Sequence, residues 1–198
     1  MDHSHIVTRF DKDLSEIESL LVEMADLVAK QINDSALALQ LGDNQLAKAV
    51  TKNDSKINRL EEKIDDKAIR LIALRQPMAE DLRSAITTLK VSNCLERMGD
   101  YAKTLSYRAR KVDDFSAMKS ILRSITETSE KIINMLNVVM EAYVNRDLNK
   151  AYDAREADQE INDRTDALFR ELLTYMMENP RNIETVSYTH LTLPTTPY

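Results

Sequence analysis

Apolar residues recur every three or four positions along most of the chain, a spacing that places them on one face of a helix. The first such stripe comprises Leu20, Met24, Leu27, Val28, Gln31 and Ile32, and the second comprises Ile57, Leu60, Ile64, Ala68, Leu71 and Ile72. Similar stretches run from about Ala79 to Arg110, from Met118 to Tyr143 and from Leu148 to Met177. The pattern predicts five helices of roughly 30 residues, each about 45 Å long.

The breaks between these stretches carry residues that end and start helices. Residues 41–44 read Leu-Gly-Asp-Asn and residues 145–147 read Asn-Arg-Asp. An Asp or Asn at such a point can cap the helix that follows. Pro77 falls where the third helix should begin, at the tolerated first-turn position. Because the connections are short, we expect neighbouring helices to be antiparallel.

The chain repeats itself at a spacing of 104 residues. Residues 54–58 (Asp-Ser-Lys-Ile-Asn) match residues 158–162 (Asp-Gln-Glu-Ile-Asn), and Asp43 stands 104 positions before Asp147. A shared spacing over several helices indicates a duplicated unit of just over 100 residues. We therefore predict two three-helix bundles in tandem, one over residues 1–112 and the other over residues 113–185.

Residues 186–198 differ in character from everything before them. They hold no charged residue and two of the four prolines. The segment resembles a translated sequencing adapter of the transposase type, so we expect a non-native tail and a native protein that continues past Thr185. A disordered native tail is the alternative. At the same 104-residue spacing the sixth helix would begin here. We therefore predict a second bundle that lacks its last helix, with an uncovered stripe of Ile132, Leu136, Leu168, Leu172 and Met176.

Composition narrows the class of protein. The chain has only two glycines and four prolines, with 43% hydrophobic and 30% charged residues, which excludes turn-rich β folds and Gly-rich phosphate loops and indicates an all-α protein. Acidic residues outnumber basic ones by 33 to 27, so the net charge of −6 argues against a nucleic-acid partner. Since no apolar stretch approaches 18 residues and the N-terminus is polar, we expect no membrane span and an intracellular protein.

The third helix carries a pair of acids that could bind a metal. Glu96 and Asp100 are four residues apart, so they lie one turn apart on one face. Two such carboxylates repel each other unless a cation lies between them, and magnesium, manganese and iron ions prefer oxygen ligands. An antiparallel second helix would bring Asp54, Asn58 and Glu61 opposite the pair. The alternative is a solvated acidic face with no ligand.

Other chemistries have less support. A ferritin-like site needs Glu-x-x-His on two helices, and a phosphotransfer bundle needs a histidine in a helix core, whereas the chain has only three histidines, at 3, 5 and 190. We interpret Cys94 as a buried packing thiol because no histidine lies near it in sequence. Gly99 in the middle of a helix indicates close approach by a neighbour or a ligand. With no nucleophile–base pair in view, we expect no enzyme.

Two nearby stretches resemble the PhoU family of phosphate-signalling proteins. They are residues 75–83 (Arg-Gln-Pro-Met-Ala-Glu-Asp-Leu-Arg) and residues 95–103 (Leu-Glu-Arg-Met-Gly-Asp-Tyr-Ala-Lys), and the opening residues 8–14 fit as well. The resemblance implies tandem three-helix bundles. It also implies a cytoplasmic regulator that associates with the phosphate ABC transporter ATPase and a phosphate-sensing histidine kinase, and that represses the phosphate-starvation response when phosphate is plentiful.

The resemblance implies site residues too. Some family members carry a metal cluster (iron, or magnesium or manganese) on Glu-x-x-x-Asp motifs, and the first motif falls on Glu96 and Asp100. Thr104 stands where many members have Asn, a better metal ligand, and Asp54 and Glu61 are less certain ligands. We also expect a homodimer, peripheral to the inner membrane through its partners. The alternative function is a helical scaffold with no metal or signalling role.

Overall fold

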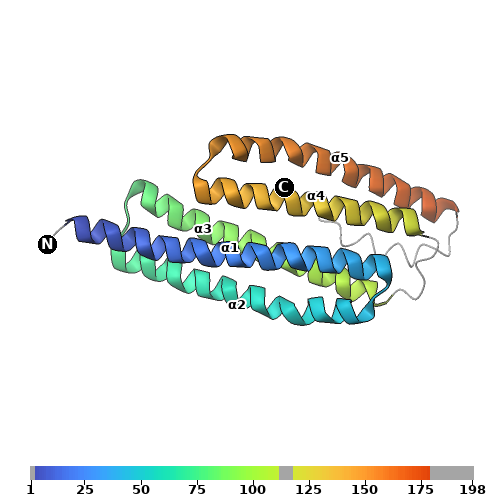
Figure 1. Ribbon diagram of the computed structural model, residues 1–198, viewed down its shortest axis with the longest axis horizontal. Coiled ribbons are helices and arrows are strands. Elements are labelled where there is room, and N and C mark those ends of the chain that lie inside the picture. The colour runs from blue at the N-terminus through green and yellow to red at the C-terminus, as the bar shows by residue number, and fades with distance from the viewer. Residues whose placement is uncertain (1–2, 112–117, 179–198) are drawn as a thin grey trace. The chain divides into compact units, whose positions relative to one another are not determined.

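The computed structural model describes residues 3–111 and 118–178, and in these ranges the chain is all-α, which confirms the predicted fold class (Figure 1). The helices are α1 (His3–Leu41), α2 (Asn44–Arg75), α3 (Ala79–Ala109), α4 (Lys119–Asn145) and α5 (Leu148–Glu178). Each of the five predicted helices is present. Pro77 lies in the loop before α3 and not in its first turn. The predicted non-native tail and the sixth helix fall outside the described residues.

The chain divides into two compact units. Unit 1 contains residues 1–28 and 55–98, and unit 2 contains residues 29–54 and 99–198. Each unit therefore takes part of α1, part of α2 and part of α3, and unit 2 also holds α4 and α5. The predicted boundary near residue 112 stays a prediction.

The core of unit 1 follows the predicted second stripe, whereas in α1 the buried positions include Ile17 and Leu21 and the predicted Leu20 and Leu27 are only half-buried. Buried apolar side chains come from all three helices: Ile17, Leu21 and Met24 of α1, Ile57 and Ile64 of α2, and Ala85 and Leu95 of α3. Glu16 of α1 pairs with Lys67 of α2, while the earlier Asp13 pairs with the later Arg75. The residue numbers of the ion-pair partners fall along α2 as they rise along α1, so the two helices are antiparallel, as predicted.

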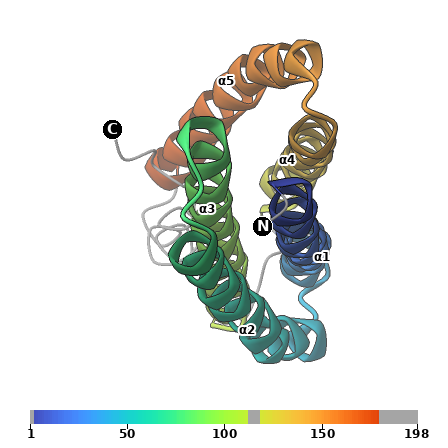
Figure 2. The ribbon, with the colours of Figure 1, turned by 90° about the vertical axis from the view of Figure 1, so that its left-hand side faces the viewer.

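Unit 2 is built around an apolar cluster that includes both α4 and α5. Its buried members are Leu39, Ala109, Met118, Ile121, Leu122, Ile125, Leu168 and Leu172. Figure 2 shows α4 and α5 joined by a short turn. They are antiparallel, because Ser120 bonds to Glu171 while Lys131 pairs with Glu160.

The expectation of an uncovered stripe on α4 and α5 is wrong. Leu136, Leu168 and Leu172 are buried, at 7%, 3% and 1% exposure, and Ile132 and Met176 are half-buried. The physical reason is that Leu39 near the end of α1 and Ala109 at the end of α3 belong to the same cluster as the α4 and α5 side chains. The helices α1 and α3 thus supply apolar cover that the sequence pattern assigned only to a sixth helix.

The predicted repeat is visible in two equivalent turns. Asp43 caps α2, where its Oδ1 accepts hydrogen bonds from the backbone N–H groups of the second and third residues that follow, at 2.8 and 3.0 Å. Asp147 caps α5 in the same way, at 3.0 and 3.2 Å. The residue before each Asp is left-handed, with φ of 63° at Gly42 and 55° at Arg146. The duplication therefore extends to the backbone geometry of the turns.

Candidate functional site

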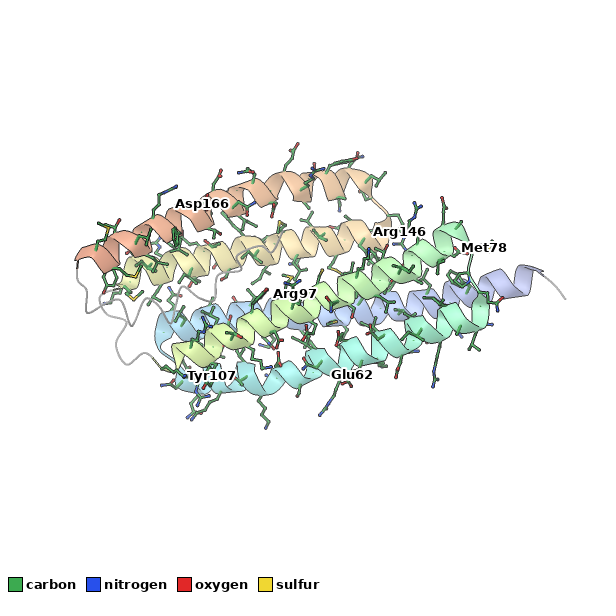
Figure 3. The ribbon with its side chains drawn as sticks, turned by 180° about the vertical axis from the view of Figure 1, so that it is seen from behind. Glu62, Met78, Arg97, Tyr107, Arg146 and Asp166 are labelled. Atoms are coloured by element: carbon green, nitrogen blue, oxygen red, sulfur yellow. The ribbon has the colours of Figure 1, made fainter. Side chains whose placement is uncertain are left out.

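The predicted acidic pair lies on the middle of α3. Figure 3 marks this part of the helix at Arg97, with Tyr107 further towards the C-terminal end. Glu96 and Asp100 are both half-buried, whereas Leu95 and Ala102 are buried. The acids therefore avoid the packed face of α3, as the helical spacing predicts.

A lysine ammonium lies between two carboxylates of this region. Lys103 Nζ is 2.7 Å from Oδ2 of Asp54 and 3.1 Å from Oδ1 of Asp100. The antiparallel arrangement of α2 and α3 thus brings Asp54 close to Asp100, as the sequence predicts. Asp54 is only 3% exposed, so its charge is buried and needs the ammonium as a partner.

Gln31 of α1 completes this network. Its Nε2 donates one hydrogen bond to Oδ1 of Asp54 and another to the carbonyl oxygen of Gly99, both at 3.0 Å. Because both partners are acceptors, the amide nitrogen must face them. Gln31 therefore contacts the backbone of α3 at Gly99. The network of Gln31, Asp54, Gly99, Asp100 and Lys103 ties α1, α2 and α3 together within unit 2.

The network stabilises the charged form of the lysine. The hydrogen bond to Asp54 raises the pKa of Lys103 and is the largest influence on it, partial burial lowers it, and the bond to Asp100 raises it again. The net direction is upward. The ammonium is therefore retained at neutral pH and stays available to both carboxylates.

The remaining predicted ligands are Glu61 of α2 and Thr104 of α3. Glu61 follows Asp54 by about two turns of α2, and burial first, then Asp65 and Glu62, raises the pKa of its carboxyl. Thr104 is half-buried directly after Lys103. The structure thus brings Asp54 and Asp100 to one ammonium and places Glu61 in an acidic stretch of α2.

As arranged, these residues suit an ammonium better than a divalent metal. Within residues 3–111 and 118–178, no group of three or more His, Cys, Asp or Glu side chains is placed so that it could hold a metal ion. Metal binding at Glu96 and Asp100 stays a prediction.

The sequence patterns did not identify Lys103 and Gln31 as members of this network. The available signals were a lysine three residues after Asp100 and a polar residue in the apolar stripe of the first helix.

The interpretation of Cys94 as a packing thiol is wrong. Cys94 is exposed, while its neighbour Leu95 is buried. Adjacent helix positions point about 100° apart, and it is Leu95 that takes the inward position. Cys94 therefore contributes a surface thiol and no packing.

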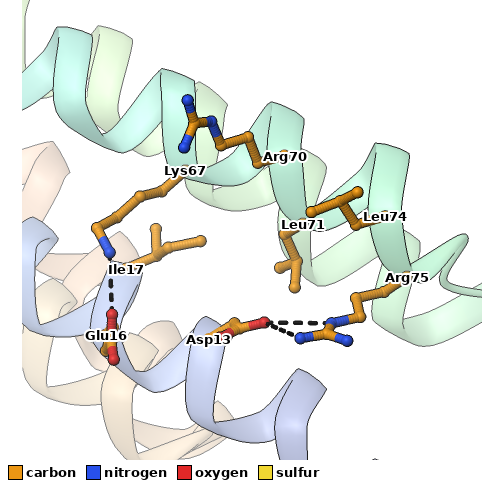
Figure 4. A pocket seen from close by; sticks show the side chains of 8 residues that line it. All are labelled: Asp13, Glu16, Ile17, Lys67, Arg70, Leu71, Leu74 and Arg75. Atoms are coloured by element: carbon orange, nitrogen blue, oxygen red, sulfur yellow. Dashed lines mark hydrogen bonds and ion pairs between the residues drawn. The ribbon is translucent and has the colours of Figure 1, made fainter. Parts of the chain in front are cut away.

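Unit 1 has a surface pocket between α1 and α2, shown in Figure 4. Lys67 pairs there with Glu16 at 2.9 Å, and the Nε and Nη2 atoms of Arg75 both reach Oδ2 of Asp13, at 3.2 and 2.9 Å. Arg70 also lines the pocket. Because the two carboxylates neutralise two of the three cations, we assign the pocket no charged ligand.

In the part of the chain that the structure describes, no helix is both long enough and apolar enough to span a membrane.

The family model for the PhoU domain matches twice, over residues 21–109 and 125–193. The two matches begin 104 residues apart, in agreement with the predicted repeat. The second match runs into residues 186–198, whose non-native origin stays a prediction.

Relatives and solved structures agree with the family match. The chain is 38% identical over 187 residues to a protein of Caulobacter vibrioides (strain NA1000 / CB15N) named phosphate-specific transport system accessory protein PhoU homolog, covering 94% of this chain and 80% of that one. A homolog of the same name from Rhizobium meliloti is also 38% identical, over 92% of this chain and 77% of its own length. The crystal structure of PhoU from Pseudomonas aeruginosa superposes with a TM-score of 0.86 at 32% identity, covering 92% of this chain and 88% of that one.

Proposed function

Because the chain belongs to the PhoU family, we propose that it regulates phosphate uptake as an accessory protein of a phosphate-specific transport system. In this proposal it links the phosphate ABC transporter ATPase to a phosphate-sensing histidine kinase and represses the phosphate-starvation response at high phosphate. It does so by binding and has no catalytic turnover of its own. It acts in the cytoplasm as a homodimer, held at the inner membrane by its partners.

The observation that carries the proposal is the similarity to the Caulobacter vibrioides protein, which extends over 94% of this chain. A binding role also needs exposed anchor residues, and aromatic side chains are enriched at protein interfaces. In unit 2, α3 exposes Tyr101 and Tyr107, at 38% and 50%. Tyr101 lies within the stretch of α3 that carries the family resemblance and Tyr107 follows it, and both are candidate anchors for a partner.

Complementation tests the regulatory role. The gene is expressed in a strain that lacks its own PhoU and carries a reporter for phosphate-starvation genes. We expect the reporter to be repressed at high phosphate and released at low phosphate. Continued expression at high phosphate, with normal levels of folded protein, would contradict the proposal.

Capture experiments separate the adaptor from the alternative, a helical scaffold without a signalling role. The tagged chain should retain the transporter ATPase and the cytoplasmic part of the kinase. The double variant Tyr101→Ala/Tyr107→Ala should retain at least tenfold less, whereas Tyr152→Ala, which removes an exposed tyrosine of α5, serves as the matched control. Retention no greater than that of an unrelated helical bundle would favour the scaffold.

A further inference from the structure

The ammonium of Lys103 fills the place between two carboxylates in which a divalent cation would bind. Its distances of 2.7 Å to Asp54 and 3.1 Å to Asp100 fit charge-assisted hydrogen bonds. All three residues belong to unit 2. An ammonium and a divalent cation cannot share these oxygens, because two positive charges at such a separation repel strongly in a partly buried site.

Both oxygens of Asp54 already have donors. Oδ2 accepts from Lys103 and Oδ1 accepts from Gln31. Gln31 is itself 4% exposed and is fixed by its second bond, to the carbonyl of Gly99. A metal ion on Oδ2 would therefore have to displace the ammonium of Lys103 from a buried carboxylate. Leaving such a donor unpaired costs free energy.

We propose that Lys103 is a built-in counter-ion that keeps Asp54 and Asp100 free of divalent metal in the native chain. Removal of the ammonium leaves two carboxylates facing one gap, and hard cations such as Mg²⁺ and Mn²⁺ bind to one or two carboxylates while they retain several waters. Loss of Lys103 thus converts Asp54 and Asp100 into a weak divalent-metal site. The inference stands independently of the proposed role in phosphate uptake.

Titration with Mn²⁺ tests the proposal, with free Mn²⁺ followed by its electron paramagnetic resonance signal. The native chain is compared with Lys103→Met, which keeps the length of the side chain and removes its charge, and with Lys103→Arg, which keeps the charge. We expect Lys103→Met to bind one Mn²⁺ with a Kd at least tenfold lower than that of the native chain. Lys103→Arg should behave as the native chain does, and Lys103→Met/Asp100→Asn should lose the gain.

Two further measurements cover the case in which Lys103→Met is poorly folded. Mn²⁺ should raise the Tm of Lys103→Met in thermal unfolding and leave that of the native chain unchanged, because only the variant binds the ion. In the native background, Asp100→Asn should leave Mn²⁺ binding unchanged. The proposal is overturned if the native chain binds Mn²⁺ as tightly as Lys103→Met, or if Asp100→Asn weakens native binding tenfold.

Discussion

Asp54 is a carboxylate that the fold can bury only because donors reach both of its oxygens. The change Asp54→Ala leaves the buried amide of Gln31 without one acceptor, whereas Lys103 keeps Asp100 and partial contact with solvent. A buried donor left unsatisfied costs about 1–3 kcal/mol. We expect Asp54→Ala to lower the free energy of unfolding by that amount, measured by urea denaturation.

The matched control is an exposed ion pair on the same stretch of α1. Lys30 pairs with Asp34 one turn later at 2.9 Å, but its side chain is 67% exposed. Exposed pairs of this kind contribute about 0.3–0.5 kcal/mol, so Lys30→Ala should have a much smaller effect. Equal losses for the two variants would show that the buried network does not stabilise unit 2.

For single residues, the sequence predicts which side chains lie close together better than it predicts which hydrogen bonds and ion pairs they form. Helical spacing and an antiparallel register are enough to place Asp54 near Asp100. They do not predict that the intervening cation is Lys103, because a long lysine can turn towards either carboxylate or into solvent. They also do not predict Gln31 as a buried donor, since a glutamine in an apolar stripe does not reveal which acceptors it will meet.

The helix α2 carries like charges on successive turns. Burial first, and then the charge of Asp66, raises the pKa of Asp65. Burial first, and then the charge of Asp65 ahead of that of Glu62, raises the pKa of Glu61. A carboxyl whose pKa is raised by folding binds protons more readily in the folded state than in the unfolded state. The stabilisation that such a group contributes is fully present below the pKa that it has in the unfolded chain. It is lost as the pH rises through the higher pKa that the group has in the folded protein.

We therefore expect Asp65→Asn to stabilise the protein at neutral pH. Like charges four residues apart on a helix cost about 0.2–0.5 kcal/mol, and the gain should be of that size. The gain should shrink as the pH falls through the raised folded pKa, because the native carboxyl then becomes neutral as well. Urea denaturation at a series of pH values checks this, and a gain that does not change with pH would contradict it.

The two equivalent turns offer a paired test on one backbone geometry. An alanine side chain at Gly42 would meet no atom within 4 Å, so Gly42→Ala tests backbone conformation alone. A left-handed φ costs a residue with a side chain about 1–2 kcal/mol, partly offset by the entropy that glycine loses on folding. We expect Gly42→Ala to destabilise by about 1 kcal/mol in thermal or urea unfolding.

At Arg146 the reverse substitution, Arg146→Gly, should raise the free energy of unfolding. Arg146→Gly relieves the left-handed conformation but loses an exposed bond from Nη1 to the Tyr143 carbonyl, at 3.2 Å, and a stack on the Tyr143 ring. We expect a stabilisation below about 1 kcal/mol, since exposed cation–π contacts contribute only about 0.5–1 kcal/mol. If both variants destabilise, the arginine contacts outweigh the backbone penalty.

Element boundaries follow closely from the sequence because period and caps agree. Asp43 and Asp147 mark the starts of α2 and α5 as expected, and α3 begins at Ala79 as predicted. The left-handed conformation of Arg146 does not follow from its identity, because arginine seldom adopts it. Only the alignment of Arg146 with Gly42 in the repeat could indicate it.

For the molecule as a whole, α1, α2 and α3 each run through both compact units without a break. Leu172 of α5 is 1% exposed and lies in the cluster that also holds Leu39 of α1. We expect Leu172→Ala to lower the free energy of unfolding by about 2–5 kcal/mol. Amide hydrogen exchange should then accelerate in α1 as well as in α5. Acceleration confined to α4 and α5 would show that the shared cluster does not couple α1 to α5.

The organisation of the core is the part that the sequence predicts least well. The 104-residue repeat predicts separate bundles, and it led to the incorrect expectation of an uncovered stripe at Leu168 and Leu172. Periodicity identifies the apolar face of each helix but not the helices that cover it. The shared cluster depends on Leu39 and Ala109, which are far from α5 in sequence.

The exposed thiol of Cys94 has a consequence for measurements of self-association. It is the only cysteine in the chain, so air oxidation can link two molecules covalently but cannot form an internal disulfide. Such a cross-linked species would have the mass of a dimer without any native interface. Light scattering or sedimentation should therefore be run with reductant and repeated on Cys94→Ser, and only association that persists in both reflects a physiological contact.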